Sequence, residues 1–301
     1  MLIAKFTVAA ACAMLVLAGA SGVQARERRK PAFDPKTIPA EWVRIPTKGQ
    51  TFTFGQQFEG KRWTYTFPAH SVTFTYDLIM SATQVTQDEY LKTTGANPTL
   101  HPGDLKRPID NVSWYDAVVY CNTLSKRDGL DPVYSYKSVT GTAAAGITAL
   151  EDFHSDIKKN GYRLLTSAEY EYVVRAGTKT TWFFGGDDAD QDQAKDYAWC
   201  DRNAAGETHP VGLLKPNAYG VHDINGNLWM WCDDWYDEGP YPGDAQTDPT
   251  GPATGTQKIA RGGAFKNDVY HERSAYHWQW RPSDHNYEVG FRIARTAPSV
   301  R

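Results

Sequence analysis

The sequence has few cysteines, and it has no second long hydrophobic run. Its 301 residues include 4 Cys, and no two of them have the Cys-x-x-Cys spacing that is typical of zinc sites and thioredoxin-like redox sites. After the apolar run at residues 7–20, no segment reaches the length that would span a bilayer. The sequence therefore predicts neither a compact cysteine-ligated metal site nor a membrane anchor.

An excess of one charge sign is also missing. The net charge is −3, which gives no electrostatic footprint for nucleic acid or for an anionic membrane surface. Hydrophobic residues make up 41% and charged residues 22%, a globular composition that can build a sizeable core. What is abundant is aromatic: 10 Trp, 17 Tyr and 12 Phe, alongside 25 Gly and 17 Pro, which predicts a loop-rich fold with amphipathic aromatic surfaces.

The N-terminal residues predict export. Lys5 precedes the apolar run at residues 7–20, and residues 23–25 have the A-x-A-like form that signal peptidase prefers. We expect a secretory signal peptide, residues 1–25, cleaved after Ala25, and a periplasmic or secreted protein. Cys12 would leave with the signal. The mature chain keeps three cysteines, Cys121, Cys200 and Cys232. This odd number allows at most one internal disulfide.

No repeat or linker divides the rest of the chain. Residues 26–45 read as an extended lead-in, and residues 46–301 as a single domain. From residue 51, aromatic and β-branched residues alternate in a strand pattern, and two further short strands are expected at residues 258–261 and 290–294. No convincing helix is expected after Gly177.

Three helices are predicted by the same spacing. In each, a Thr or Ser is followed three residues later by an acid, which is the capping-box pattern, and the segment runs on to a Gly that can end a helix. The pairs are Thr86 with Glu89, Ser113 with Asp116, and Thr166 with Glu169, and the glycines are Gly95, Gly129 and Gly177. The fold class is therefore α+β, with few helices, short strands and long ordered loops.

Six motifs follow one another in a recognisable order. They are VTQDEY (85–90), RPIDNVSWYDAVVYCNTLSKRDGL (107–130), YRLLTSAEYEYVVRAG (162–177), HPVGLLKPNAYGVHDINGNLWMWCDDWY (209–236), ARGGAFKN (260–267) and RSAY…VGFRIAR (273–295). In this order and spacing they resemble the formylglycine-generating-enzyme (sulfatase-modifying factor) family. The resemblance covers most of the mature chain and implies a variant of the C-type lectin fold, low in regular secondary structure. We expect Arg261 and Arg292 to be structural ion-pair partners.

The resemblance breaks where the family has its catalytic thiolates. Family members carry a Ser and two Cys after Arg-Gly-Gly, and the two thiolates bind copper(I), because soft sulfur selects that ion. Alignment on residues 261–263 places Ala264, Asn267 and Glu272 at these three positions. Formation of formylglycine by the family mechanism is therefore not expected.

A calcium site of the family is also altered. The resemblance places Asp223, Gly226, Leu228 and Met230 at its four ligand positions, and Met offers calcium no hard oxygen. We expect a weakened calcium site that is not filled. A redox metal, copper or iron, has no support either, because the spacings of His271, His277 and His285 match no compact ligand motif.

Residues 269–288 replace the lost cysteine segment, and they support an enzyme hypothesis. Glu272 would act as a general base, with His271 and His277 assisting. Substrate-binding residues would be Asn267, Tyr270, Tyr276, Trp278, Trp280, Arg281 and His285. The pyoverdine-maturation branch of the family is the nearest analogue and implies oxidation or another modification of a peptide or peptide-derived substrate, such as a siderophore chromophore, in the periplasm.

The same segment supports an alternative, a ligand-binding module. C-type-lectin-like folds display ligand-binding surfaces, and aromatic and arginine side chains supply contact energy at such surfaces. Tyr276, Trp278, Trp280 and Tyr287 around Arg281 and Asp284 would form this patch. The sequence favours the enzyme hypothesis over the binding module. It leaves open whether the substrate is a peptide or a small molecule, and it does not determine the oligomeric state.

Overall fold

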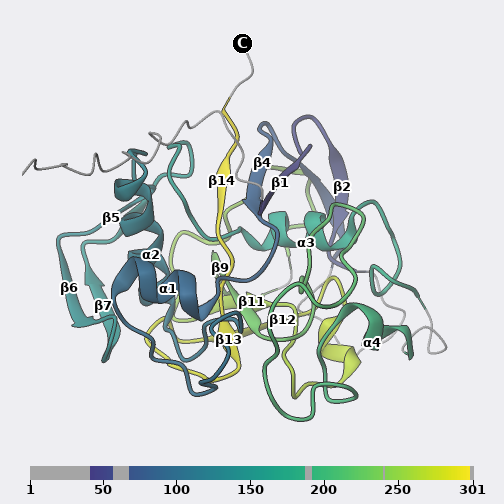
Figure 1. The fold of residues 1–301 in the computed structure, drawn as a ribbon. Helices are drawn as coiled ribbons and strands as arrows, with labels where there is room; N and C mark the ends of the chain where they lie inside the picture. The colour runs from purple at the N-terminus through teal and green to yellow at the C-terminus, as the bar shows by residue number, and fades with distance from the viewer. Residues whose placement is uncertain (1–40, 57–67, 187–191, 240, 299–301) are drawn as a thin grey trace, which may run out of the picture. The chain divides into compact units, whose positions relative to one another are not determined.

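The computed structural model describes residues 41–56, 68–186, 192–239 and 241–298 (Figure 1). The predicted signal peptide, with Cys12, and residues 26–40 of the predicted lead-in lie outside these residues. The last residues of the lead-in form β1 (Trp42–Ile45). Within the described part of the chain, no helix has the length and hydropathy needed to cross a membrane.

Three sheets of three or four strands carry the fold, and all of their strands are short. The first has the order β1-β4-β14, with β4 (Leu78–Ser81) between its antiparallel neighbours β1 and β14 (Ala294–Thr296). The second has the order β10-β3-β2, with the bounds Gln246–Thr247, His70–Thr73 and Thr51–Phe54. The central sheet has the order β12-β11-β9-β13, with the bounds His277–Trp280, Lys258–Arg261, Trp229–Trp235 and Val289–Gly290. Two strand pairs complete the set: β5 (Tyr134–Ser135) with β8 (His154–Ser155), and β6 (Ser138–Thr142) with β7 (Gly146–Glu151).

The three predicted helices are confirmed, and each starts with a complete capping box. They are α1 (Gln87–Thr94), α2 (Trp114–Arg127) and α3 (Ser167–Arg175). The C-caps fall at the predicted glycines or one residue before them: α1 is capped by a left-handed Gly95, α2 by Asp128 and α3 by a left-handed Ala176. Two single turns after Gly177 were not expected, α4 (Ala194–Tyr197) and the 3-10 turn η3 (Val269–Glu272).

The predicted strand at residues 258–261 is confirmed as β11, whereas the one at residues 290–294 is wrong. Gly290 pairs with β9 in the central sheet, and Ala294 pairs with β4 in another sheet, so the chain crosses between two sheets within these residues. The longest strand, β9, had no sequence signal. Its residues are nearly all buried, so it shows no alternation of polar and apolar residues.

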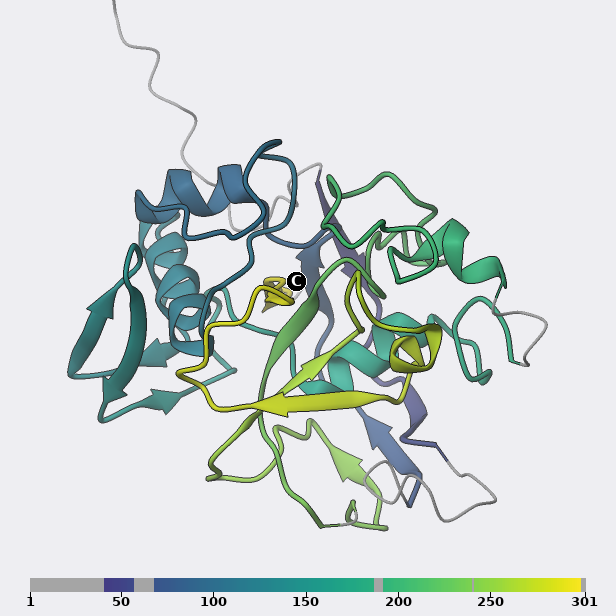
Figure 2. The same cartoon turned by 90° about the horizontal axis from the view of Figure 1, so that it is seen from below.

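The central sheet separates two parts of the core. On one face, Trp231 packs with residues of α2, and its indole N–H donates to the carbonyl of Val112 at 3.0 Å. On the other face, Met230, Cys232 and Ile259 pack with Tyr170 and other residues of α3. Figure 2 shows the sheet with α1 and α2 at one side and α3 at the other.

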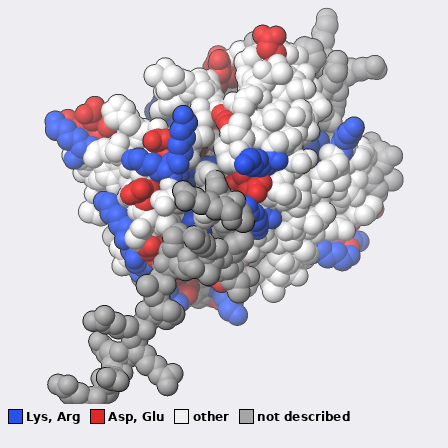
Figure 3. Space-filling view, turned by 90° about the horizontal axis from the view of Figure 1, so that it is seen from above, with Lys and Arg blue, Asp and Glu red and all other residues white. Residues whose placement is uncertain are grey.

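Buried arginines fix α3 to these sheets. Arg163 forms a bidentate pair with Glu169, both contacts at 2.7 Å, and Arg261 contacts Glu171 at 3.3 Å, as expected for an ion-pair partner. Arg292 differs from the expectation: its guanidinium donates to the backbone carbonyls of Ser81, His222 and Asp223, and no ion pair of the described residues includes it. On the surface, Lys and Arg lie among Asp and Glu over the visible face (Figure 3), in keeping with the small net charge.

Candidate functional site

The loop from Gly263 to Glu272 occupies the position of the family's cysteine segment. Asn267, at the place of the first cysteine, shapes this loop. Its side-chain oxygen accepts from the backbone N–H of Ala264 at 2.8 Å, and its carbonyl accepts from the N–H of Asp201 at 3.0 Å. The carboxamide oxygen of Asn267 is therefore engaged in a hydrogen bond within the loop and does not point to a substrate.

Glu272, at the place of the second cysteine, is fully buried at the end of η3. Neither of its carboxyl oxygens has a hydrogen-bond partner among the described residues. Burial, followed by the charges of Asp201 and Asp268, raises the pKa of this carboxyl well above its ordinary value. The environment of Glu272 therefore favours the protonated form of its carboxyl.

Cys200 lies close enough to Glu272 for their charges to interact. Burial raises the pKa of the Cys200 thiol to about 12, with the charge of Glu272 as the next cause. Copper(I) in the family is held by two thiolates, and Cys200 is one buried thiol, so it does not by itself restore the missing pair. All three described cysteines are free and buried, and no group of three or more His, Cys, Asp or Glu among the described residues could hold a metal ion.

The three residues predicted to be catalytic do not form one group. His271 directly precedes Glu272, contacts Asp268 at 2.7 Å through Nδ1, and its ring centroid lies 5.1 Å from that of Tyr276. His277 starts β12 opposite Arg261, on the other face of the sheet, where it lines a cavity with Ile259. Burial, then the charge of Arg261, lowers the pKa of His277 well below its ordinary value, so it is neutral.

Three predicted substrate-binding aromatics, Tyr276, Trp278 and Trp280, lie on the face opposite to His277, and the fourth, Tyr270, lies in η3. Only some of them are accessible. Tyr276 is buried, with its ring centroid 6.0 Å from that of Trp229. Trp280 packs edge-on against Trp229 and Trp231, each at 5.9 Å. Trp278 and Tyr270 are 42% and 45% exposed, so these two residues can meet a ligand.

The last two predicted binding residues have structural contacts. The backbone N–H of Arg281 donates to Asp284 at 3.1 Å, while its side chain faces solvent. The Nε2 atom of His285 lies at hydrogen-bonding distance, 3.0 Å, from the carboxylate of Asp116 at the start of α2. The ring also packs against Gly146, where an added Cβ would lie 2.3 Å from the same Nε2 atom. His285 thus ties the segment to α2.

One polar group near this face had no sequence signal. His101 Nδ1 lies 2.9 Å from Asp110, whose carboxylate also accepts from Thr99 and from the N–H of Leu100. The His101 ring centroid lies 6.0 Å from that of Tyr287, whose hydroxyl accepts from Lys266 at 2.9 Å. His101 and Asp110 share the segment between α1 and α2, whereas Lys266 and Tyr287 come from distant segments, so local spacing could not indicate that the two pairs meet.

The altered calcium site does not fit a calcium ion. The side-chain nitrogen of Gln84 lies 2.8 Å from the carbonyl oxygen of Leu228, 3.3 Å from that of Gly226 and 3.4 Å from that of Asp223, and it donates to all three. An amide nitrogen therefore occupies the space between these carbonyls. The Asp223 carboxyl accepts from the N–H of Gly212 at 2.7 Å, and burial raises its pKa, which weakens it further as a ligand.

These features define an α+β protein of the C-type-lectin-like type with a cysteine-free loop at its candidate site. The chain belongs to the family of the sulfatase-modifying factor enzyme 1-like domain, whose profile matches residues 27–297. Membership supports, at the level of the family, a modifying enzyme that works without the usual thiolate pair.

Two solved structures and one relative are similar over most of their length. Treponema denticola variable protein 1 is 29% identical with a TM-score of 0.72, covering 85% of this chain and 95% of that one. PvdO from Pseudomonas aeruginosa is 25% identical with a TM-score of 0.65, covering 87% and 99%. The chaperone protein LppX of Paenibacillus barcinonensis is 27% identical over 73% of this chain and 80% of that protein.

Proposed function

We propose that this protein is an exported modifying enzyme that acts on a peptide or peptide-derived substrate through an acid–base step at Glu272. The observation that carries this proposal is the Glu272 carboxyl itself, which is fully buried, without a hydrogen-bond partner in the described residues, and aligned with the family's second cysteine. The predicted signal peptide supports export to the periplasm or beyond.

An unpartnered buried carboxyl is costly to the fold. Leaving such a group without a hydrogen bond costs about 1–3 kcal/mol, so its presence calls for a reason outside stability. Strongly raised pKa values of this kind are typical of catalytic acids. Because its oxygens are closed off, reaction at Glu272 requires the η3 turn to move when substrate enters.

Two accessible aromatics, Tyr270 in this turn and Trp278 on β12, favour an aromatic group on the substrate. Tyr270 and Trp278 offer flat, exposed faces that can stack on such a group. The similarity to PvdO supports a related role, with a siderophore chromophore as one candidate substrate. If the modification is an oxidation, dioxygen is the electron acceptor. The substrate then loses two electrons and two protons, and hydrogen peroxide forms. Glu272 donates its own proton to the reduced dioxygen and takes up one of the two protons that the substrate releases.

Glu272→Gln tests the proposal, with Glu288→Gln as the matched control in the same segment. Each protein is incubated in air with peptide extracts of the exported fraction, and the products are followed by mass spectrometry. We expect the wild type and Glu288→Gln to convert a peptide by loss of two hydrogen atoms, and Glu272→Gln to lose at least about a hundredfold in rate. Conversion that survives Glu272→Gln at full rate would show that the assignment is wrong.

A binding module is the second candidate. The exposed aromatic side chains of Tyr270 and Trp278 favour it. A peptide that is held equally by wild type and Glu272→Gln, emerges with unchanged mass, and is released by Trp278→Ala would favour binding over catalysis.

A further inference from the structure

A cavity of about 520 Å³ lies on the face of the central sheet that carries His277. Its walls include Phe54, Tyr236, Tyr241 and several prolines, and no residue of the loop from Gly263 to Glu272 lines it. The cavity is therefore separate from the candidate site described above. Its volume and its mostly apolar wall are typical of small-molecule sites.

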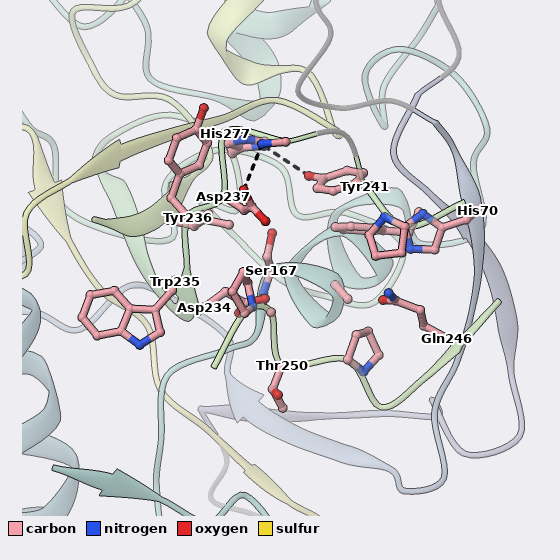
Figure 4. A pocket seen from close by; sticks show the side chains of 18 of the residues that line it. His70, Ser167, Asp234, Trp235, Tyr236, Asp237, Tyr241, Gln246, Thr250 and His277 are labelled. Atoms are coloured by element: carbon pink, nitrogen blue, oxygen red, sulfur yellow. Dashed lines mark hydrogen bonds between the residues drawn. The ribbon is translucent and has the colours of Figure 1, made fainter. Parts of the chain in front are cut away.

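The charged groups of this cavity are carboxylates. Asp234 and Asp237 line it, and its described lining includes no Lys or Arg. Figure 4 shows Asp237 beside His277 and Asp234 beside Ser167, and both line the same cavity. His277 is neutral, because burial lowers its pKa, so it does not offset them.

The nearest cations are engaged elsewhere. Lys258 donates to the backbone carbonyl of Asp233 at 2.7 Å, and its ammonium lies 3.8 Å from the centre of the Trp235 ring. Arg261 donates to the hydroxyl of Ser167 and contacts Glu171. Asp234 accepts one bond from the N–H of Ser167 at 2.8 Å, and it has no ion pair within the described part of the chain.

We propose that this cavity is a second binding site, which takes a small organic amine with an aromatic or apolar body. The ammonium would pair with Asp234, and the body would lie against the aromatic and proline side chains of the lining, since aromatic rings favour both apolar groups and cations. A carboxylate in an apolar cavity gains most from a ligand that supplies the opposite charge. This inference does not depend on the proposed role of Glu272.

Calorimetric titration with tyramine, compared with its neutral analogue 4-hydroxyphenethyl alcohol, tests the proposal. At about pH 8 we expect tyramine to bind at least about tenfold more tightly than the alcohol. Burial raises the pKa of Asp234 to about 7, so the carboxylate is charged above that pH and protonated below it. The advantage of tyramine should therefore shrink at about pH 5.5.

Two variants keep the test decisive. Asp234→Asn should remove the preference for tyramine, and Thr250→Lys should remove tyramine binding by placing a cation in the lining while it leaves the Asp234 hydrogen bond intact. Asp244→Asn, a nearby carboxylate outside the lining, and Glu272→Gln should both bind as the wild type does. Equal affinity for tyramine and the alcohol, no binding of either, or indifference to both cavity variants would overturn the proposal.

Discussion

At the scale of single residues, the backbone of Gly263 lies so close to the side chain of Glu272 that only a glycine fits there without strain. Its φ is +73°, and a Cβ there would lie 2.9 Å from Glu272 Cγ. Gly263→Ala should lower the free energy of unfolding by about 1–3 kcal/mol, measured by denaturant titration. Gly206→Ala is the matched control, because its φ is +77° and no atom lies within 4 Å of the added Cβ. A similar loss at both positions would show that the contact with Glu272 contributes nothing.

Asp234 should give stability a pH dependence. Its pKa rises from 3.8 to about 7 on folding, so the folded state holds the proton more tightly. Stability from this group is present at low pH and is lost as the pH rises between these two pKa values, by about 1.4 kcal/mol for each pH unit. In thermal melts, the Asp234→Asn variant should have a higher melting temperature than the wild type at about pH 8. At about pH 4 the two melting temperatures should be similar. A constant difference across this range would contradict the raised pKa.

The sequence could assign residue types to the candidate site but not their places relative to the sheet. Glu272 and His271 are neighbours in sequence, so they stay together in the structure. His277 is only a few residues further on, yet the alternation of β12 turns it to the opposite face. Cys200 approaches Glu272 from a distant segment, and nothing local could indicate that.

At the scale of elements, the three capping boxes differ in burial. Thr166 is fully buried, and its partner Glu169 also holds Arg163, whereas the box of Thr86 and Glu89 is exposed. Thr166→Ala should cost about 2 kcal/mol and Thr86→Ala about 1 kcal/mol of unfolding free energy. Chemical denaturation of the two variants checks the order, and equal losses would mean that burial does not strengthen the cap.

The segment from Asp223 to Leu228 is held by Gln84 in place of an ion. Prolonged treatment with EDTA should therefore leave the melting temperature unchanged. Gln84→Ala should cost about 1–3 kcal/mol, because it leaves buried carbonyls without a donor. A melting temperature that falls in EDTA and recovers with calcium would contradict the misfit to the ion.

Elements were predictable where the signal is local. The three helices carry their start signals within four residues, and β11 is a short run bounded by polar residues. In contrast, β9 is nearly all buried, and residues 290–294 serve two sheets, because strand pairing there depends on partners far away in sequence. The β-propensities of single residues do not determine which strands pair.

At the scale of the whole molecule, stability does not depend on a disulfide among the described residues. Cys121, Cys200 and Cys232 are free and buried. A reducing agent should leave the melting temperature of the purified protein unchanged, and the thiols should react with a thiol reagent only after unfolding. A lower melting temperature in dithiothreitol, with a slower band on denaturing gels, would reveal a bridge.

The pairing of β14 with β4 sets an order of events during synthesis. Strand β4 lies between β1 and β14, so its sheet stays incomplete until residues 294–296 have been translated. Strand β13 likewise joins β9 only at the same late stage. The sheet of β1, β4 and β14 and the edge of the central sheet at β13 therefore stay open until residues 289–296 have left the ribosome, which leaves these strands of the nascent polypeptide accessible to chaperones until then.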